Sequence, residues 1–170
     1  MKMPFEEVFE LSSRIQESFI STPEFKDSKR IALYASFRNE VLTDDILTAA
    51  VKQRKEVFFP KLVSPGKIVF LAVRAKTELF QGSHDIPEPL AGGRPESVET
   101  FDLMVAPGVV FDENGGRIGY GKGYYDRILC EARCRVVALA FDFQVREEVP
   151  CEEHDMTVDA IVTERRIVRV

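Results

Sequence analysis

Short apolar segments separated by amphipathic stretches are the feature that most constrains how this chain can fold. The segments that we interpret as strands are Arg30–Ser36, Glu56–Val63, Lys67–Arg74, Phe101–Phe111 with a break at Pro107-Gly108, Arg135–Phe141, Ala160–Thr163 and Ile167–Val170. Several are apolar at consecutive positions, which is typical of strands that are buried on both faces. Because helical stretches alternate with them, the pattern predicts an α/β fold with a mixed or parallel sheet and helices on both faces.

Three helices and one long loop are predicted between these strands. The second helix follows Thr43, which we interpret as its N-cap, and the third runs from Tyr124 to about Arg133. The segment Gln81–Pro95 holds three glycines and three prolines, so we expect a long ordered loop there instead of a continuous helix or ladder. The first helix carries a mostly apolar stripe at helical spacing, formed by Phe5, Val8, Phe9, Ser12, Ile15 and Phe19.

Length and composition narrow the class of protein further. The 170 residues suit one domain, residues 1–170, and the net charge of −5 argues against a nucleic-acid binder, which normally carries a basic surplus. No apolar run approaches the roughly 18 residues of a membrane span. Three cysteines cannot all pair within one chain, and so few of them suit a reducing cytosol. We therefore expect a cytoplasmic monomer that binds neither nucleic acid nor membrane.

The glycine-rich stretch Gly115–Arg127 predicts a phosphate-binding loop. Its five glycines allow close backbone approach, a predicted helix begins directly after it, and Arg117 and Lys122 add positive charge. It is not a standard P-loop, because Gly123 stands where Ser or Thr would hold Mg²⁺. A carboxylate would have to hold the metal instead, and Asp126 is one turn away. The alternative is a glycine-rich hairpin with two solvated basic residues.

The other candidate site residues are of functional interest mainly in combination with this loop. Asp155 is a second possible magnesium ligand, or else a turn residue that accepts local backbone hydrogen bonds. Glu40 follows the first strand, where ligands often bind in α/β folds, or is a surface carboxylate. Four residues have the donor types of a zinc site, although their spacing is not that of a finger: Cys130, Cys134, Cys151 and His154. With only two histidines, chemistry based on phosphate, metal and positioning fits better than covalent catalysis.

Two blocks of the chain together resemble the 5-formyltetrahydrofolate cyclo-ligase (methenyltetrahydrofolate synthetase) family. They are Asp102–Asp112, with the sequence DLMVAPGVVFD, and Gly119–Arg127, with the sequence GYGKGYYDR. Supporting blocks are Ile31–Tyr34 with Glu40, Phe59–Lys61, Ile86–Pro89, Asp155–Asp159 and the final strand. The resemblance covers most of the chain, from about Phe25 to Val162. It implies a three-layer α/β/α sandwich with a mixed, mostly parallel sheet.

The resemblance also implies a reaction. Family members convert 5-formyltetrahydrofolate to 5,10-methenyltetrahydrofolate with ATP and Mg²⁺: the formyl oxygen attacks the γ-phosphate, N10 attacks the activated carbon, and phosphate leaves. Carried over, Arg117 and Lys122 would be catalytic and would bind ATP together with Gly119, Gly121, Gly123, Tyr124 and Tyr125. Asp126 and Asp155 would hold Mg²⁺. The folate would contact Ala35, Glu40, Tyr124 and Tyr125.

Two departures from the family pattern keep other hypotheses open. Members normally begin with a helix whose Lys-x-x-x-Arg motif reaches ATP, and Lys2 does not match it. The alternative to the enzyme is therefore a family member with weakened or lost turnover that acts as a folate- or nucleotide-binding protein. Ser83-His84-Asp85 also replaces an aromatic residue often found before the Ile86–Pro89 block. A third hypothesis is an isomerase or transferase with a similar sheet.

Overall fold

A seven-stranded mixed sheet forms the centre of the molecule in the computed structural model, which describes residues 3–82, 85–121, 123–150 and 155–170. The strand order is β12-β11-β9-β6-β1-β2-β3, in which the five inner strands run parallel and the two edge strands, β3 and β12, run antiparallel to their neighbours. Their bounds are β1 Arg30–Ala32, β2 Glu56–Ser64, β3 Lys67–Ala72, β6 Leu103–Ala106, β9 Arg135–Leu139, β11 Ala160–Val162 and β12 Ile167–Arg169.

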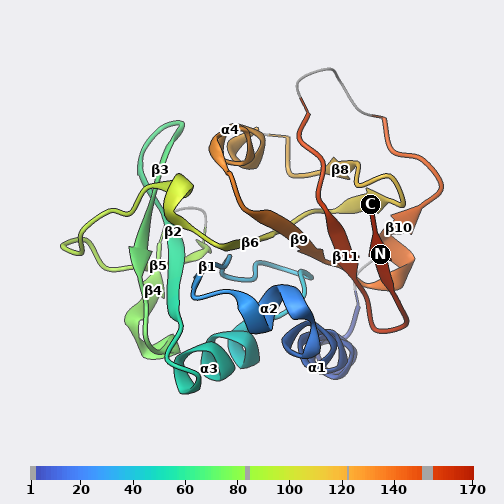
Figure 1. The fold of residues 1–170 in the computed structure, drawn as a ribbon, viewed down its shortest axis with the longest axis horizontal. Helices are drawn as coiled ribbons and strands as arrows, with labels where there is room; N and C mark the ends of the chain where they lie inside the picture. The colour runs from blue at the N-terminus through green and yellow to red at the C-terminus, as the bar shows by residue number, and fades with distance from the viewer. Residues whose placement is uncertain (1–2, 83–84, 122, 151–154) are drawn as a thin grey trace.

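Helices cover both faces of this sheet, so the predicted three-layer α/β/α fold with a mixed, mostly parallel sheet is confirmed (Figure 1). On one face lie α1 (Phe5–Ser21), α2 (Pro23–Asp27) and α3 (Asp44–Lys52). On the other lies α4 (Tyr124–Glu131). No helix within the described ranges is long and apolar enough to cross a membrane.

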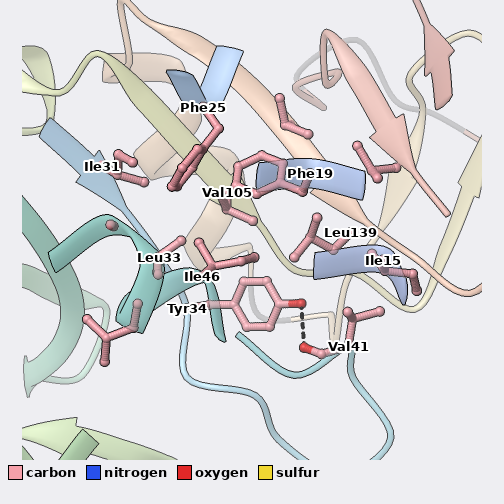
Figure 2. Close-up of a cluster of buried hydrophobic side chains, with 14 of the residues drawn as sticks. Ile15, Phe19, Phe25, Ile31, Leu33, Tyr34, Val41, Ile46, Val105 and Leu139 are labelled. Carbon is pink, nitrogen blue, oxygen red and sulfur yellow. Dashed lines mark hydrogen bonds between the residues drawn. The ribbon is translucent and has the colours of Figure 1, made fainter. Parts of the chain in front are cut away.

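Successive strand residues supply two separate hydrophobic clusters, one on each face. In β6, Leu103 and Val105 pack with the α1–α3 layer, whereas Met104 and Ala106 pack with α4. Figure 2 shows the first cluster, in which Phe19 of α1 and Phe25 of α2 meet the sheet. Both rings are fully buried, which contributes roughly 1.5–3 kcal/mol each relative to exposure. This two-sided burial is the reason that the strands are apolar at consecutive positions.

Two smaller sheets extend the fold beside the central one. Strands β10 (Val145–Arg146), β7 (Val110–Asp112) and β8 (Arg117–Ile118) form one of them. Strands β4 (Leu79–Gln81) and β5 (Pro87–Pro89) form the other. Pro107-Gly108 therefore separates β6 from β7, as the predicted break in Phe101–Phe111 requires, and the two strands belong to different sheets. Three single-turn 3-10 helices complete the described elements: Lys76–Glu78, Val98–Thr100 and Asp142–Gln144.

The prediction that Gln81–Pro95 forms one long loop is wrong in part, because Gln81 belongs to β4 and Pro87–Pro89 forms β5. Pro87 and Pro89 lie in β5, opposite Gln81 and Leu79 of β4. A two-stranded ribbon tolerates proline because the ring nitrogen that lacks a hydrogen can face away from the partner strand. The ribbon places Ile86 and Glu88 beside the cavity described below.

Three further expectations from the sequence are corrected at particular residues. Phe5 and Phe9 are exposed, so the buried stripe of α1 includes only Val8, Ser12, Ile15 and Phe19 of the predicted set. Strand β1 ends at Ala32, although the Leu33 N–H still donates to the carbonyl of Phe58. Thr43 occupies the N-cap position of α3, but its hydroxyl donates to the Tyr34 carbonyl. The first amides of that helix, Asp45 and Ile46, donate instead to Oε1 of Gln16 in α1.

Candidate active site

A cavity of about 1190 Å³ lies at the carboxyl ends of β1 and β6. In the strand order β9-β6-β1-β2, β1 and β6 are neighbours. The chain continues from β1 to β2 on one side of this pair, and from β6 it later reaches β9 on the other side. Loops that follow two such strands diverge, and ligands of α/β proteins bind in the crevice between them. Here the β1 loop contributes Tyr34, Ala35, Phe37 and Glu40 to the cavity lining, and residues 117–121 of the glycine-rich stretch line the same cavity.

The turn at Asp112–Gly115 builds the glycine-rich wall. Gly115 has a φ of +83°, and the N–H of Gly115 donates to the carbonyl of Asp112, which closes the turn between β7 and β8. Gly108 lies against this hairpin so closely that an added Cβ would be 2.5 Å from the Phe111 ring and 3.0 Å from Cγ of Arg117. Glycine at these two positions therefore lets the hairpin fold back so that Arg117 lines the cavity.

Arg117 is the buried positive charge of the site. Its side chain is only 3% exposed, and its Nη2 donates to Oδ1 of Asp126 at 2.6 Å. Its guanidinium carbon lies 6.0 Å from the ring centroid of Tyr125. The Nε–H of Arg117 has no hydrogen-bond partner among the described residues. A buried guanidinium with a free donor is suited to bind an anionic ligand such as a phosphate.

The start of α4 lies at the same cavity. Gly121 and Gly123 adopt left-handed conformations, with φ of +79° and +61°, and Gly123 is the N-cap residue of α4. Among the described residues, no side chain forms a capping hydrogen bond at this helix end. The first amides of a helix attract anions when no side chain satisfies them. Gly119, Gly121, Gly123 and Tyr124 all line the cavity.

Glu40 is a buried acid that lines the same cavity. Its Oε2 accepts a hydrogen bond of 2.8 Å from the N–H of Phe37, yet burial outweighs this bond and raises the pKa of the carboxyl group to about 7. Burial and the charge of Glu40 also raise the pKa of Tyr34 and Tyr125. The hydroxyl of Tyr125 has no hydrogen-bond partner within the described part of the chain. The site therefore offers a neutral phenol donor beside a carboxyl group that ionises near neutral pH.

The described candidate residues meet at this one cavity. Those that line it are Ala35, Glu40, Arg117, Gly119, Gly121, Gly123, Tyr124, Tyr125, Asp126 and Asp155. Lys122 lies outside the described residues, as do Cys151 and His154 of the alternative zinc site. Of the other two zinc candidates, Cys130 is exposed and Cys134 is half-buried, and no disulfide joins them. No cluster of three metal-ligating side chains is found among the residues that the structure describes.

The donor set fits a phosphate-bearing ligand together with Mg²⁺. Asp126 and Asp155 supply carboxylate oxygens, which Mg²⁺ prefers, and they bring no nitrogen or sulfur ligand. Arg117 supplies a charge and a free donor for phosphate. Because Oδ1 of Asp126 is hydrogen-bonded to Arg117, the second oxygen of this carboxylate is the one better placed to accept a metal. The specific roles of these residues remain predictions.

Glu88 also lines the cavity. In the sequence it stands out only as part of the Ile86–Pro89 block. Its carboxylate is buried, lies 3.5 Å from Nζ of Lys61, and accepts a long hydrogen bond from the Leu62 N–H. Lys61 also donates to the carbonyl of Pro89. Through these two contacts Lys61, in β2, holds the β4–β5 ribbon against the central sheet. An added Cβ on Gly82 would be 2.6 Å from Glu88, so glycine makes room for this side chain.

Comparison with known proteins identifies one family. The family model described as 5-formyltetrahydrofolate cyclo-ligase matches residues 1–164. The chain is 34% identical over 172 residues to 5-formyltetrahydrofolate cyclo-ligase from Mus musculus, a match that covers 94% of this chain and 85% of that protein. Its identity to the protein of the same name from Escherichia coli is 29%, covering 93% of this chain and 90% of that one. The NMR structure of 5,10-methenyltetrahydrofolate synthetase from Aquifex aeolicus is similar with a TM-score of 0.87 and 36% identity, covering 98% of this chain and 84% of that chain.

Proposed function

The chain belongs to the 5-formyltetrahydrofolate cyclo-ligase family, and we propose that it converts 5-formyltetrahydrofolate to 5,10-methenyltetrahydrofolate with ATP and Mg²⁺. The observation that carries this proposal is that one cavity is lined both by the buried acid Glu40 and by the glycine-rich stretch with Arg117. A reaction that joins a folate to a phosphoryl donor needs both kinds of group at one space. The volume of about 1190 Å³ is at the upper end of ligand pockets, as two substrates require.

The proposed reaction needs positioning and charge rather than a protein nucleophile. The formyl oxygen of the folate forms a bond to the γ-phosphorus of ATP, and the bond from that phosphorus to the β,γ-bridging oxygen breaks, releasing ADP. N10 of the folate then bonds to the formyl carbon and loses its proton. The carbon–oxygen bond breaks, and the former formyl oxygen leaves with inorganic phosphate. In-line transfer of this kind is accelerated mainly by alignment and by neutralisation of charge.

The proposal assigns one set of residues to the folate and another set to the phosphates and Mg²⁺. Glu40 accepts hydrogen bonds from N–H groups of the pterin, and the walls formed by Ala35 and Tyr125 exclude water from it. Arg117 uses its guanidinium, including the free Nε–H, to neutralise phosphate oxygens, while the backbone from Gly119 to Gly123 and the start of α4 hold the phosphates. Asp126 and Asp155 would hold Mg²⁺, which supplies charge neutralisation on the phosphates when bound. Lys122 is assigned to the phosphates from the sequence alone.

One assay tests the proposal. The protein is mixed with 5-formyltetrahydrofolate, ATP and Mg²⁺, and formation of the methenyl product is followed by its absorbance. We expect product that depends on both ATP and Mg²⁺, and release of ADP and phosphate in equal amounts. Absence of product at high protein concentration, with folate and nucleotide still bound, would favour a binding protein without turnover. Absence of both binding and product would contradict the assignment of the cavity.

A further inference from the structure

Asp112 is a buried carboxylate to which the proposed reaction assigns no role. Its side chain is 3% exposed and accepts three backbone hydrogen bonds. Oδ1 accepts from the N–H groups of Asn114 and Gly116 at 2.9 and 2.8 Å, and Oδ2 accepts from the N–H of Val149 at 2.9 Å. The two oxygens therefore join two separate parts of the chain, because Val149 is 37 residues further along.

A second contact joins the same two parts. The N–H of Val158 donates to the carbonyl of Gly115 at 3.0 Å. The approach is so close that a Cβ on Gly115 would lie 2.4 Å from the Val158 carbonyl oxygen. The turn at Asp112–Gly116 is consequently attached to the chain at both Val149 and Val158.

These attachments connect the two segments that carry Arg117 and Asp155. The hairpin that follows the turn brings Arg117 to the cavity. Pro150, next to Val149, and Asp155, three residues before Val158, line the same cavity. The register of the hairpin, in which Phe111 lies opposite Arg117, places the guanidinium relative to the turn. Arg117 and Asp155 are thus both positioned from the single turn that the Asp112 carboxylate organises.

We propose that Asp112 is a positioning residue of the reaction, which sets the placement of Asp155 relative to Arg117. This inference rests on the proposed function, because it assigns Arg117 to phosphate and Asp155 to Mg²⁺. Asp112 itself contacts neither substrate: it acts through the turn, Val149 and Val158. Groups that hydrogen-bond metal ligands directly commonly affect metal affinity or activity by about 10- to 100-fold, which is the upper bound for a residue that acts through the backbone as Asp112 does.

The test variant is Asp112→Asn, which retains the size of the side chain. An amide has only one acceptor oxygen, so its NH₂ group must face either the turn amides or the Val149 N–H, and two donors then oppose each other. We expect the affinity for ADP with Mg²⁺, measured by calorimetry, to fall by up to about 10- to 100-fold, and the kcat/KM for ATP to fall with it. Binding of 5-formyltetrahydrofolate should be unchanged, because the hydrogen bonds of the Asp112 side chain come from Asn114, Gly116 and Val149 and none comes from the β1 loop that carries Glu40.

Asp102→Asn is the matched control. Oδ2 of Asp102 also accepts two backbone hydrogen bonds, from Lys29 and Arg30 at 2.9 Å each, but it lies at the amino end of β6, away from the cavity. This variant should lower the melting temperature without changing nucleotide affinity. If Asp112→Asn does not fold, Asp112→Glu keeps both acceptor oxygens and displaces them by one methylene, and we expect the same selective loss from it.

Three outcomes separate the inference from its premise. Wild-type affinity for ADP with Mg²⁺ in Asp112→Asn would overturn the positioning role. Equal loss of folate and nucleotide binding would also overturn it, because that result shows a merely structural residue. If the wild-type protein itself neither binds ADP with Mg²⁺ nor forms the methenyl product, the proposed function fails and the inference fails with it.

Discussion

Among single residues, Glu40 shows most directly how burial sets chemistry in this protein. A glutamate on the surface ionises near pH 4.5, whereas the buried carboxyl group of Glu40 has a pKa of about 7. Burial disfavours the charged form, and the single hydrogen bond from Phe37 does not compensate fully. The same carboxyl group is therefore a source of both pH-dependent binding and pH-dependent stability, with opposite signs.

Folate affinity should rise with pH through about 7 in the wild-type protein. The ionised carboxylate is the better acceptor for N–H groups of a pterin, and it forms as the pH passes its pKa. Glu40→Gln should bind 5-formyltetrahydrofolate more weakly by about tenfold or more and lose this pH dependence. Fluorescence titration of both proteins across the neutral range checks the prediction. An equal rise of folate affinity with pH in Glu40→Gln would show that another group is responsible.

Stability of the unliganded protein should change in the opposite direction. The folded state keeps the proton of Glu40 up to about pH 7, whereas the unfolded chain releases it near 4.5. Stability therefore falls as the pH rises through this window, by an amount on the order of 3 kcal/mol. Glu40→Gln should remove the decline and be more stable than the wild-type protein above pH 7. Urea unfolding on both sides of the window measures it, and an equal decline in the variant would contradict the assignment to Glu40.

Within single elements, the glycine-rich segment between β8 and α4 combines backbone conformation with function. Gly121 has a φ of +79°, and its missing Cβ would meet open space. Gly66, in the turn between β2 and β3, has a φ of +80° and the same open surroundings. The two glycines thus impose nearly the same backbone requirement, but only Gly121 lines the cavity.

This pair gives a matched experiment. Alanine at either position is strained in the left-handed region, so Gly121→Ala and Gly66→Ala should each lower the free energy of unfolding by about 1 kcal/mol. Only Gly121→Ala should also weaken binding of ADP with Mg²⁺, because it displaces the amides that we assign to phosphate. Thermal unfolding and calorimetry on both variants test this. Equal nucleotide affinity in the two would refute the phosphate assignment of this loop.

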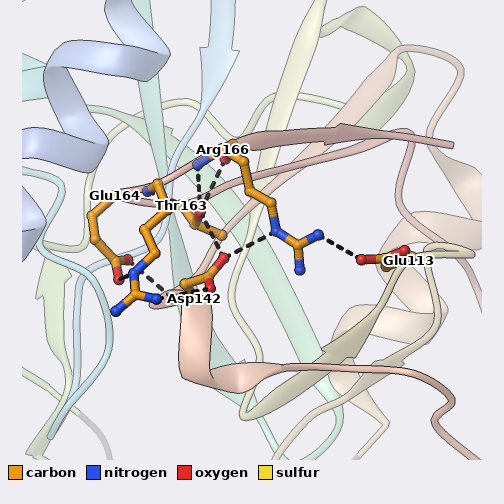
Figure 3. Close-up of polar contacts among 6 residues, drawn as sticks. Glu113, Asp142, Thr163, Glu164 and Arg166 are labelled. Carbon is orange, nitrogen blue, oxygen red and sulfur yellow. Dashed lines mark hydrogen bonds and ion pairs between the residues drawn. The ribbon is translucent and has the colours of Figure 1, made fainter.

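Across the whole molecule, a polar network connects elements that are far apart in the sequence (Figure 3). Arg166, in the turn between β11 and β12, donates through Nε to Asp142 at 3.1 Å and through Nη1 to Glu113 at 2.6 Å. Thr163 accepts from the Arg166 N–H and donates to Asp142. Glu113 adjoins Asp112, so the network supports the same turn from the solvent side.

Arg166→Ala should lower the melting temperature slightly, and the difference from the wild-type protein should shrink in molar salt. Exposed ion pairs contribute little and are screened by ions. Thermal unfolding at low and high salt checks this, with Arg14→Ala as a control that loses an exposed pair to Glu10 within α1 only. A large loss that persists in high salt would show that Arg166 acts through packing instead.

The sequence by itself determined the α/β class, the mostly parallel character of the sheet and the glycine-rich stretch that lines the cavity. These signals are local: consecutive apolar residues report burial on both faces, and clustered glycines report left-handed backbone. The resemblance of two short blocks to one family then supplied the list of candidate site residues. Those candidates that the structure describes line one cavity. Local periodicity also misled, because Phe5 and Phe9 have helical spacing with Val8 but face solvent.

Only the tertiary structure decided which distant groups meet. Gln16 caps α3 across 29 residues, Glu88 is buried against Lys61, and Asp112 joins the glycine-rich turn to Val149. The physical reason is that each of these polar groups is satisfied by a backbone or charge partner that folding brings from elsewhere. Such partners leave no periodic trace near the residue itself. Most of the elements were therefore predictable from local pattern, whereas the attachment of the Asp112–Gly116 turn to Val149 and Val158 is formed by long-range hydrogen bonds.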